Sequence, residues 1–226
     1  MAKIKNVKTK LFDELKELAE SRTSIESYHF NFLQNFYENS KVIHFHIKEK
    51  TEKSILEIMY RQYFVFLISC WETYFRDVFL LTYASDESLM CELLENFEID
   101  DSVLEQLNSN NMEVIDLLSK KFNFQNLDSL NNAFSILISD DDFLEYICTY
   151  QIEFCGINGK QVSNLSVDSL FLNWKELITK TFEIRHKVIH DANYRPSFDI
   201  HFIQQVEGLF LLVPQISTYV ITKNLI

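Results

Sequence analysis

Glycine and proline are scarce in this sequence, with 3 and 2 residues respectively in a chain of 226. These residues supply most of the tight turns of sheet proteins, so the turn signals are too few for a many-stranded sandwich or barrel. Long apolar runs are missing as well. The most apolar stretch, Tyr63 to Trp71, is soon followed by charged side chains (Glu72, Arg76 and Asp77), well short of a bilayer's thickness. The composition predicts an all-α protein without a membrane span.

Cysteine is rare and irregularly spaced, with four residues and no C-x-x-C pair. Their apolar surroundings predict buried, reduced thiols rather than a disulfide or metal framework (Cys70, Cys91, Cys148 and Cys155). The first residues are basic and lack the apolar core of a secretory signal. We therefore expect a cytoplasmic protein.

Positive charge is in short supply, with 21 Lys and Arg against 33 Asp and Glu and a net charge of −12. This balance disfavours a broad electrostatic surface for nucleic acid or for an anionic membrane, so any RNA contact must be local. The acidity is concentrated in residues 86–153, which carry 16 acidic and 2 basic side chains. We interpret this stretch as an acidic insertion of short helices within one helical domain covering residues 1–226.

Apolar spacing predicts four principal helices, at Lys10 to about Glu38, Thr51 to Thr82, Ser169 to His190 and Asp199 to Thr222. Five shorter helices are expected between Leu89 and Phe154, followed by a loop around Gly156 to Gly159. Ser166 or Asp168 would cap the third principal helix. Pro196 would prevent that helix from continuing, and Pro214 is expected to bend the last one.

One segment near the end of the third principal helix combines a guanidinium and two imidazoles, in Arg185, His186 and His190. At about 100° per residue, the two histidines share one side of a helix, whereas Arg185 and His190 diverge by about 140° and would flank a cleft. A guanidinium offers paired donors to a phosphate, and an imidazole can give or take a proton near neutral pH. These are the two chemical functions that phosphodiester cleavage needs.

Two other interpretations of the same residues stay open. Cationic side chains near a helix C-terminus often only complement the helix dipole. His186 and His190 also have the i,i+4 spacing of a zinc pair, but Lys187 occupies the position of the metalloprotease glutamate. His44 and His46 alternate like a short extended ligand pair without an evident third ligand. We therefore predict no metal and no cofactor.

The spacing Arg185-His186-x-x-x-His190 resembles the R-x(4)-H signature of the HEPN superfamily. The earlier segment Phe66 to Phe75, which contains Trp71 and Glu72, is similar to the helix that packs against this motif in stand-alone HEPN proteins. The resemblance covers residues from about Thr51 to Thr222 and is poor over the acidic insertion.

The resemblance implies an all-α HEPN-like bundle, a homodimer, and metal-independent endoribonuclease activity of the kind found in toxin–antitoxin, abortive infection and antiviral defence systems. It assigns catalysis to Arg185 and His190, with His186 as an auxiliary residue. A cognate antitoxin or another regulatory protein would be a partner.

A dimer also has a chemical reason. Attack by the ribose 2′-hydroxyl needs a base and an acid, which a two-fold axis would supply as two copies of His190. Glu72 either pairs with Arg185 and orients it or pairs with Arg76 four residues later. Asp191, Asn193 and Tyr194 are candidate substrate contacts at the end of the helix.

A rival hypothesis has the same fold but no catalytic activity. A non-catalytic, HEPN-like dimeric binding or regulatory module would retain the motif for structure. Its acidic insertion would then be a surface for a basic partner.

Overall fold

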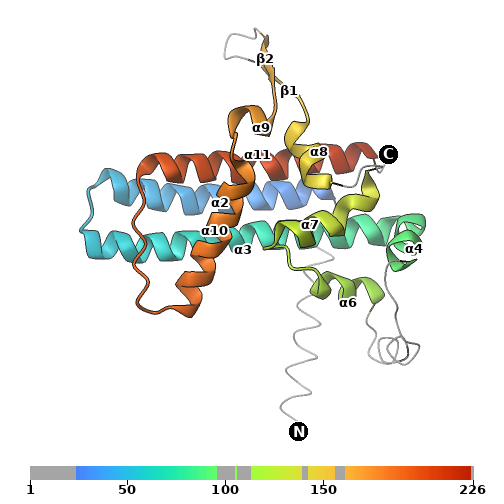
Figure 1. Ribbon diagram of the computed structural model, residues 1–226, viewed down its shortest axis with the longest axis horizontal. Coiled ribbons are helices and arrows are strands. Elements are labelled where there is room, and N and C mark those ends of the chain that lie inside the picture. The colour runs from blue at the N-terminus through green and yellow to red at the C-terminus, as the bar shows by residue number, and fades with distance from the viewer. Residues whose placement is uncertain (1–23, 96–104, 106–112, 139–141, 156–160, 225–226) are drawn as a thin grey trace.

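The computed structural model describes residues 24–95, 105, 113–138, 142–155 and 161–224. Three long helices lie along one another, namely α2 (Ile25–Lys48), α3 (Lys53–Ser85) and α11 (Ile200–Asn224). A fourth, α10 (Trp174–His190), crosses this layer and packs on both α3 and α11 (Figure 1). The prediction of a mostly helical protein is confirmed.

Helix α2 begins at a capping box. The Ser24 side chain accepts a hydrogen bond from the Ser27 amide at 3.2 Å, and the Ser27 hydroxyl accepts one from the Ser24 amide at 3.3 Å. The backbone of Ser24 is extended, so a helix running from Lys10 through this residue is wrong. Residues 10–23 lie outside the described part of the chain.

The predicted end of that helix, at about Glu38, is also wrong, since α2 continues to Lys48. Two polar residues just after Glu38 make contacts with the neighbouring helices. The Asn39 amide donates to the Tyr63 carbonyl of α3 at 3.1 Å, and the Ser40 hydroxyl donates to Glu207 of α11 at 2.5 Å. Because these polar side chains have partners on α3 and α11, they do not interrupt helix α2.

The second and fourth predicted helices match α3 and α11 to within three residues at each end. Asp199 accepts from the Phe202 amide at 2.7 Å and so starts α11, while Pro214 lies inside that helix. The third predicted helix, Ser169 to His190, is wrong at its start. A short helix α9 (Val167–Leu170), preceded by Ser166 as its N-cap, is separated from α10 by a turn at residues 171–173.

The acidic insertion forms short helices, as predicted, where the structure describes it. They are α4 (Glu87–Glu95), α6 (Val114–Lys121), α7 (Leu127–Phe134), the single-turn η1 (Ser135–Leu137) and α8 (Phe143–Thr149). Their aromatic side chains face the bundle. Phe134 stacks on Phe143 at 5.0 Å between centroids and meets Phe79 of α3 at 6.1 Å. The insertion therefore shares the core of the long helices and leaves its charges outside.

A small hairpin after α8 was not expected. Strand β1 (Ile152–Cys155) pairs antiparallel with β2 (Gln161–Leu165), with a register shift between Phe154 and Cys155. The hairpin projects away from the long helices in Figure 1. The prediction that the short helices continue to Phe154 is thus wrong, because Ile152–Cys155 is a strand of this hairpin. The predicted loop around Gly156 to Gly159 lies outside the described residues.

The core is rich in aromatic rings, and Trp71 of α3 lies fully buried at its centre. Its ring centroid is 4.7 Å from Phe75, 6.0 Å from Phe182 of α10 and 4.6 Å from Phe210 of α11. The indole N–H donates to the Phe124 carbonyl at 3.0 Å. This side chain joins α3, α10, α11 and the loop before α7, so it fixes the position of α10.

The cysteines fit the prediction in part. Cys148 is buried and Cys70 is half-buried, and burial raises the pKa of the Cys70 thiol to about 11. Cys91 is exposed on α4, so the prediction that it is buried is wrong, because its side of this peripheral helix faces solvent. None of the helices in the described ranges is both long and apolar enough to span a bilayer.

Candidate functional site

The two motif histidines lie side by side on the last turn of α10. Helical spacing brings His186 and His190 to 4.4 Å between ring centroids, and both side chains are exposed. Within the described residues neither ring has a hydrogen-bond partner. The prediction that they share one side of the helix is confirmed, and their ring nitrogens are free to meet a ligand.

Arg185 points to the other side of α10 and is half-buried. Its Nε is shielded from solvent and has no hydrogen-bond partner among the residues that the structure describes. An unpaired buried donor costs about 1–3 kcal/mol, so this N–H is available to an acceptor that the described residues do not supply. Arg185 and His190 do not contact each other within one chain, in agreement with their predicted divergence.

Sequence reasoning missed Arg61 of α3, which holds the end of α10. Its guanidinium donates to the Val188 carbonyl at 3.3 Å and to the Ala192 carbonyl at 3.2 Å. It thereby satisfies carbonyl groups that the end of a helix leaves open and sets the direction of the chain after His190. The general preference of cationic side chains for helix C-termini is the only sequence signal for this role of Arg61, and that preference does not identify which Lys or Arg binds there.

The loop after α10 is organised by Asp191. Its carboxylate accepts from the Asn193 amide at 2.8 Å, and its carbonyl accepts from the Tyr194 amide at 3.1 Å. Asp191 thus shapes the turn, while the Asn193 side chain is exposed and Tyr194 is half-buried. Burial raises the pKa of Tyr194. Of the three candidate substrate contacts, Tyr194 has the ring surface that a nucleobase can use.

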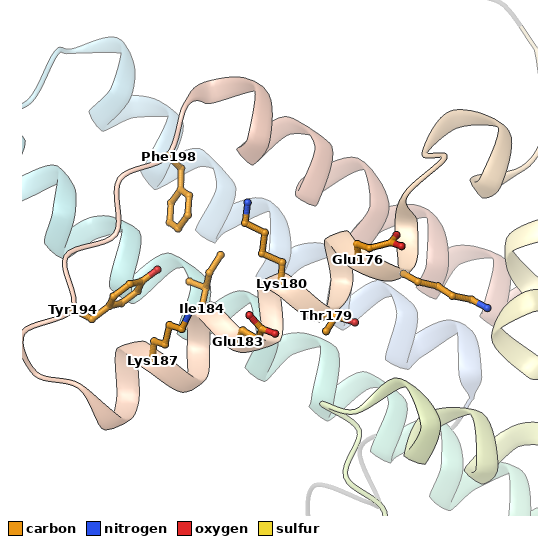
Figure 2. Close-up of a pocket in the computed structure, with 9 residues that line it drawn as sticks. Glu176, Thr179, Lys180, Glu183, Ile184, Lys187, Tyr194 and Phe198 are labelled. Carbon is orange, nitrogen blue, oxygen red and sulfur yellow. The ribbon is translucent and has the colours of Figure 1, made fainter.

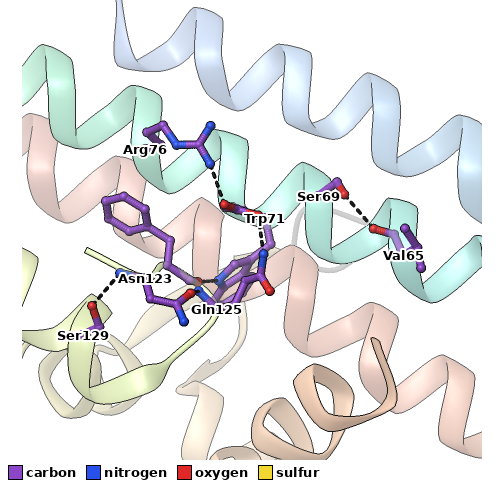
Figure 3. A network of polar contacts seen from close by, with 9 residues as sticks. Val65, Ser69, Trp71, Arg76, Asn123, Gln125 and Ser129 are labelled. Atoms are coloured by element: carbon purple, nitrogen blue, oxygen red, sulfur yellow. Dashed lines mark hydrogen bonds and ion pairs between the residues drawn. The ribbon is translucent and has the colours of Figure 1, made fainter. Parts of the chain in front are cut away.

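Glu72 pairs with Arg76 rather than with Arg185. The Glu72–Arg76 distance is 2.6 Å, and Gln125 donates to the second carboxylate oxygen. Figure 3 shows Arg76 and Gln125 approaching this point from α3 and from the loop before α7. Of the two alternatives for Glu72, the ion pair within α3 is the one that forms. Glu72 links the insertion to α3 and makes no contact with the motif.

His44 and His46 do not form an extended ligand pair, because both lie on helix α2. His44 Nε2 is 2.8 Å from Glu207, and His46 Nδ1 is 3.1 Å from the Thr51 hydroxyl. These contacts take the two rings in different directions. Across the described ranges, no three His, Cys, Asp or Glu side chains come close enough to hold a metal ion.

Two surface hollows flank α10. The first, of about 640 Å³, lies between α10 and the 191–199 loop, where Tyr194 and Phe198 face lysines of the helix (Figure 2). The second, of about 470 Å³, lies between α10 and α3 and includes Arg61, Phe66 and Val188. The motif helix therefore has a charged groove on one side and a more apolar one on the other.

Comparison with protein families, with curated proteins and with solved structures finds no match for this chain. We therefore infer the function from the geometry of α10 and its surroundings.

Proposed function

We propose that this protein is a metal-independent endoribonuclease of the HEPN type, acting as a homodimer, with Arg185 and His190 as catalytic residues and His186 as an auxiliary. A toxin or an anti-phage effector is the biological role that suits such an enzyme. The proposal follows from the resemblance of the motif and from the state of its side chains.

The observation that carries the proposal is the set of unpaired polar groups at the end of α10. Two exposed imidazoles lie 4.4 Å apart, and an arginine nearby keeps a shielded, unbonded Nε. A histidine that only complements the helix dipole needs neither a second ring nor an unbonded guanidinium beside it. The shielded Nε of Arg185 is the costly group of the three, and together with two exposed imidazoles it favours a ligand with phosphate oxygens.

The chemistry follows from these groups. In one protomer His190 removes the proton of a ribose 2′-hydroxyl, and the oxygen attacks the adjacent phosphorus. The bond from phosphorus to the 5′-oxygen breaks, and His190 of the second protomer protonates the leaving oxygen. The two Arg185 guanidinium groups stabilise the charge that develops on the phosphate. The products are a 2′,3′-cyclic phosphate and a 5′-hydroxyl.

Exposed apolar side chains near the second hollow support the proposed homodimer. Ile58 and Phe66 on its wall are 54% and 45% exposed, and Ile189, one turn after Arg185, is 47% exposed. Exposed apolar side chains gathered on one face are typical of association sites. A two-fold contact at this face would bring both motif helices together and enclose the two guanidinium groups.

The test is cleavage of a labelled single-stranded RNA in excess EDTA, with product ends identified by mass. We expect 2′,3′-cyclic phosphate ends and a loss of at least about 100-fold in rate for each of Arg185→Ala and His190→Ala. Removing an acid–base group costs roughly that much or more, and so does removing a group that stabilises charge in the transition state. His201→Ala is the matched control, because this histidine is exposed on α11 rather than on α10.

Cleavage that disappears in EDTA and survives both motif substitutions would refute the mechanism. Absence of cleavage, together with equal growth of cells expressing the wild type and His190→Ala, would favour the rival non-catalytic module. Growth arrest by the wild type alone would support a toxin role. Mixing the wild type with an excess of His190→Ala protein tests the composite site. A heterodimer keeps only one His190, so the wild-type activity should fall once the protomers exchange, whereas independent sites would leave it unchanged.

A further inference from the structure

The groove between α10 and the 191–199 loop has a chemical character that the chain as a whole lacks. Its charged lining comprises three lysines and two glutamates, and its apolar lining includes two aromatic rings (Lys175, Lys180, Lys187, Glu176, Glu183, Tyr194 and Phe198). The chain carries a net charge of −12, whereas this lining is balanced, with two lysines against two glutamates once Lys175 is paired with Glu145 outside the groove. The groove therefore repels a polyanion less than the chain as a whole does.

Two of the lysines form no ion pair within the described residues, although Glu176 and Glu183 lie four residues before them on α10. Lys175 is bound to Glu145 at 2.8 Å, which neutralises it. Lys180 instead lies 4.7 Å above the Phe202 ring centroid, and Lys187 makes no ion pair within the described residues. Both ammonium groups can thus accept a phosphate without first breaking a salt bridge.

The two aromatic rings of the groove play different parts. Phe198 stacks on Phe202 at 4.9 Å and 22°, and it also packs edgewise on Phe64 at 4.9 Å, so it belongs to the wall. Tyr194 is half-buried and has no ring neighbour within the described residues. Figure 2 shows it on the loop opposite Ile184 and Lys187. Tyr194 therefore has a face available for stacking by an incoming base.

On α10 the lining of the groove ends at Lys187, about one helical turn before the motif histidine His190. Lys180, Glu183, Lys187 and His190 follow one another at separations of three, four and three residues, which places them along one face of α10. Lys187 is about 4.5 Å along the helix axis from His190, and Lys180 is about 10 Å further away. A strand lying in the groove would thus reach His190 with its backbone beside the lysines.

We infer that this groove binds the unpaired strand of an RNA substrate, with Lys180 and Lys187 on phosphates and Tyr194 stacked on a base, and that it delivers the scissile phosphate to His190. The inference rests on the proposed function for the role of His190 and goes beyond it in assigning the binding residues. Stacking on Tyr194 requires a base released from a duplex, so the groove selects single-stranded RNA over double-stranded RNA.

The test measures binding separately from cleavage. A short, fluorescently labelled oligonucleotide with 2′-O-methyl riboses has no free 2′-hydroxyl and cannot be cut by the proposed reaction. Its dissociation constant is measured by anisotropy at several salt concentrations for the wild type and for the double variant Lys180→Gln/Lys187→Gln. The double variant should lower the slope of log K against log salt by about 1.4, since each contact with a single-stranded phosphate contributes about 0.7.

Tyr194→Ala should weaken binding about 5- to 150-fold, and Tyr194→Phe should keep the affinity, because stacking uses the ring and not the hydroxyl. Lys48→Gln removes an exposed lysine at the end of α2 and should leave both the affinity and the slope unchanged. The thermal midpoint of each variant shows whether it is folded.

Three outcomes would overturn the inference: an unchanged salt slope in the folded double variant, duplex binding as tight as single-strand binding, or equal competition by polyglutamate with no effect of Tyr194→Ala. The last would identify the groove as a site for an acidic protein. If the groove variants weaken binding but His190→Ala does not affect cleavage, RNA binding in the groove is supported and the proposed catalytic role of His190 is refuted. If His190 is essential but the double variant binds like the wild type, the groove inference fails alone.

Discussion

Glu207 of α11 joins three helices and offers a sharp test of how the bundle is held together. Its side chain is mostly buried and accepts hydrogen bonds from Ser40 at 2.5 Å and from Tyr63 at 3.0 Å, while His44 lies 2.8 Å away. Burial and the Glu207 charge both raise the pKa of Tyr63, so the phenol stays a donor. Glu207→Ala removes the common acceptor of this network.

The expected loss is about 3 kcal/mol of unfolding free energy. The buried bond from Tyr63 to the carboxylate contributes about 1.5–3 kcal/mol, and the half-buried Ser40 bond adds about 1 kcal/mol. His44 is 37% exposed, so its ion pair is discounted to nearly nothing. For a chain of this length such a loss lowers the thermal midpoint by about 6–12 °C.

Urea unfolding at neutral pH measures the loss, and a double-mutant cycle with Tyr63→Phe identifies its source. In the wild type, Tyr63→Phe should cost about 1.5–3 kcal/mol, whereas in Glu207→Ala it should cost nothing, because the hydroxyl has already lost its acceptor. Glu38→Ala, at an exposed position of α2, should stay within about 0.5 kcal/mol of the wild type. Equal costs of Tyr63→Phe in both backgrounds would refute the network.

Three further predictions concern Arg61, Gly208 and the half-buried thiol of Cys70. Arg61→Ala should loosen the last turn of α10. It should lower the proposed RNA cleavage more than tenfold in kinetic assays and the unfolding free energy by about 1–2 kcal/mol in urea. Equal activity would contradict the positioning role of Arg61. Gly208→Ala should lower the unfolding free energy by about 1–3 kcal/mol in urea unfolding, because the new Cβ would lie 2.8 Å from Phe171 Cζ. In a Phe171→Ala background this contact is gone, and the same substitution should be neutral or stabilising. The unfolding free energy should fall between pH 9 and 11, because burial raises the pKa of Cys70 to about 11 and the thiol of the unfolded chain loses its proton first. Cys70→Ala should make this fall with pH shallower when urea unfolding is measured across the same pH range.

The extent of sequence-based prediction can be judged from individual elements. Periodic apolar positions located α3 and α11 to within three residues, because a helix that packs along its whole length repeats its buried face at a local period. The same logic missed the end of α2, where Asn39 and Ser40 are polar and yet bonded to other helices. It also merged α9 with α10, since nothing local in residues 171–173 marks the turn as strongly as a proline would.

For the candidate site, spacing alone placed His186 beside His190 and turned Arg185 away, because rotation per residue is a property of any α-helix. The pairing of Glu72 stayed open in the sequence, since i,i+4 attraction and a tertiary ion pair are both plausible for a half-buried glutamate. The structure shows the local pair with Arg76, completed by Gln125 from the insertion.

The sequence by itself determined the helical class, the acidic insertion and the cluster of arginine and histidines, all of which depend on composition or on near neighbours in the chain. The tertiary structure alone decided that Arg61 holds the end of α10, that Glu207 joins Ser40 and Tyr63, and that Tyr194 faces the lysines across a groove. Those contacts join residues that are brought together by the way α10 crosses α3 and α11. The crossing is set by the packing of Trp71 and its aromatic neighbours, a three-dimensional fit that no local pattern encodes.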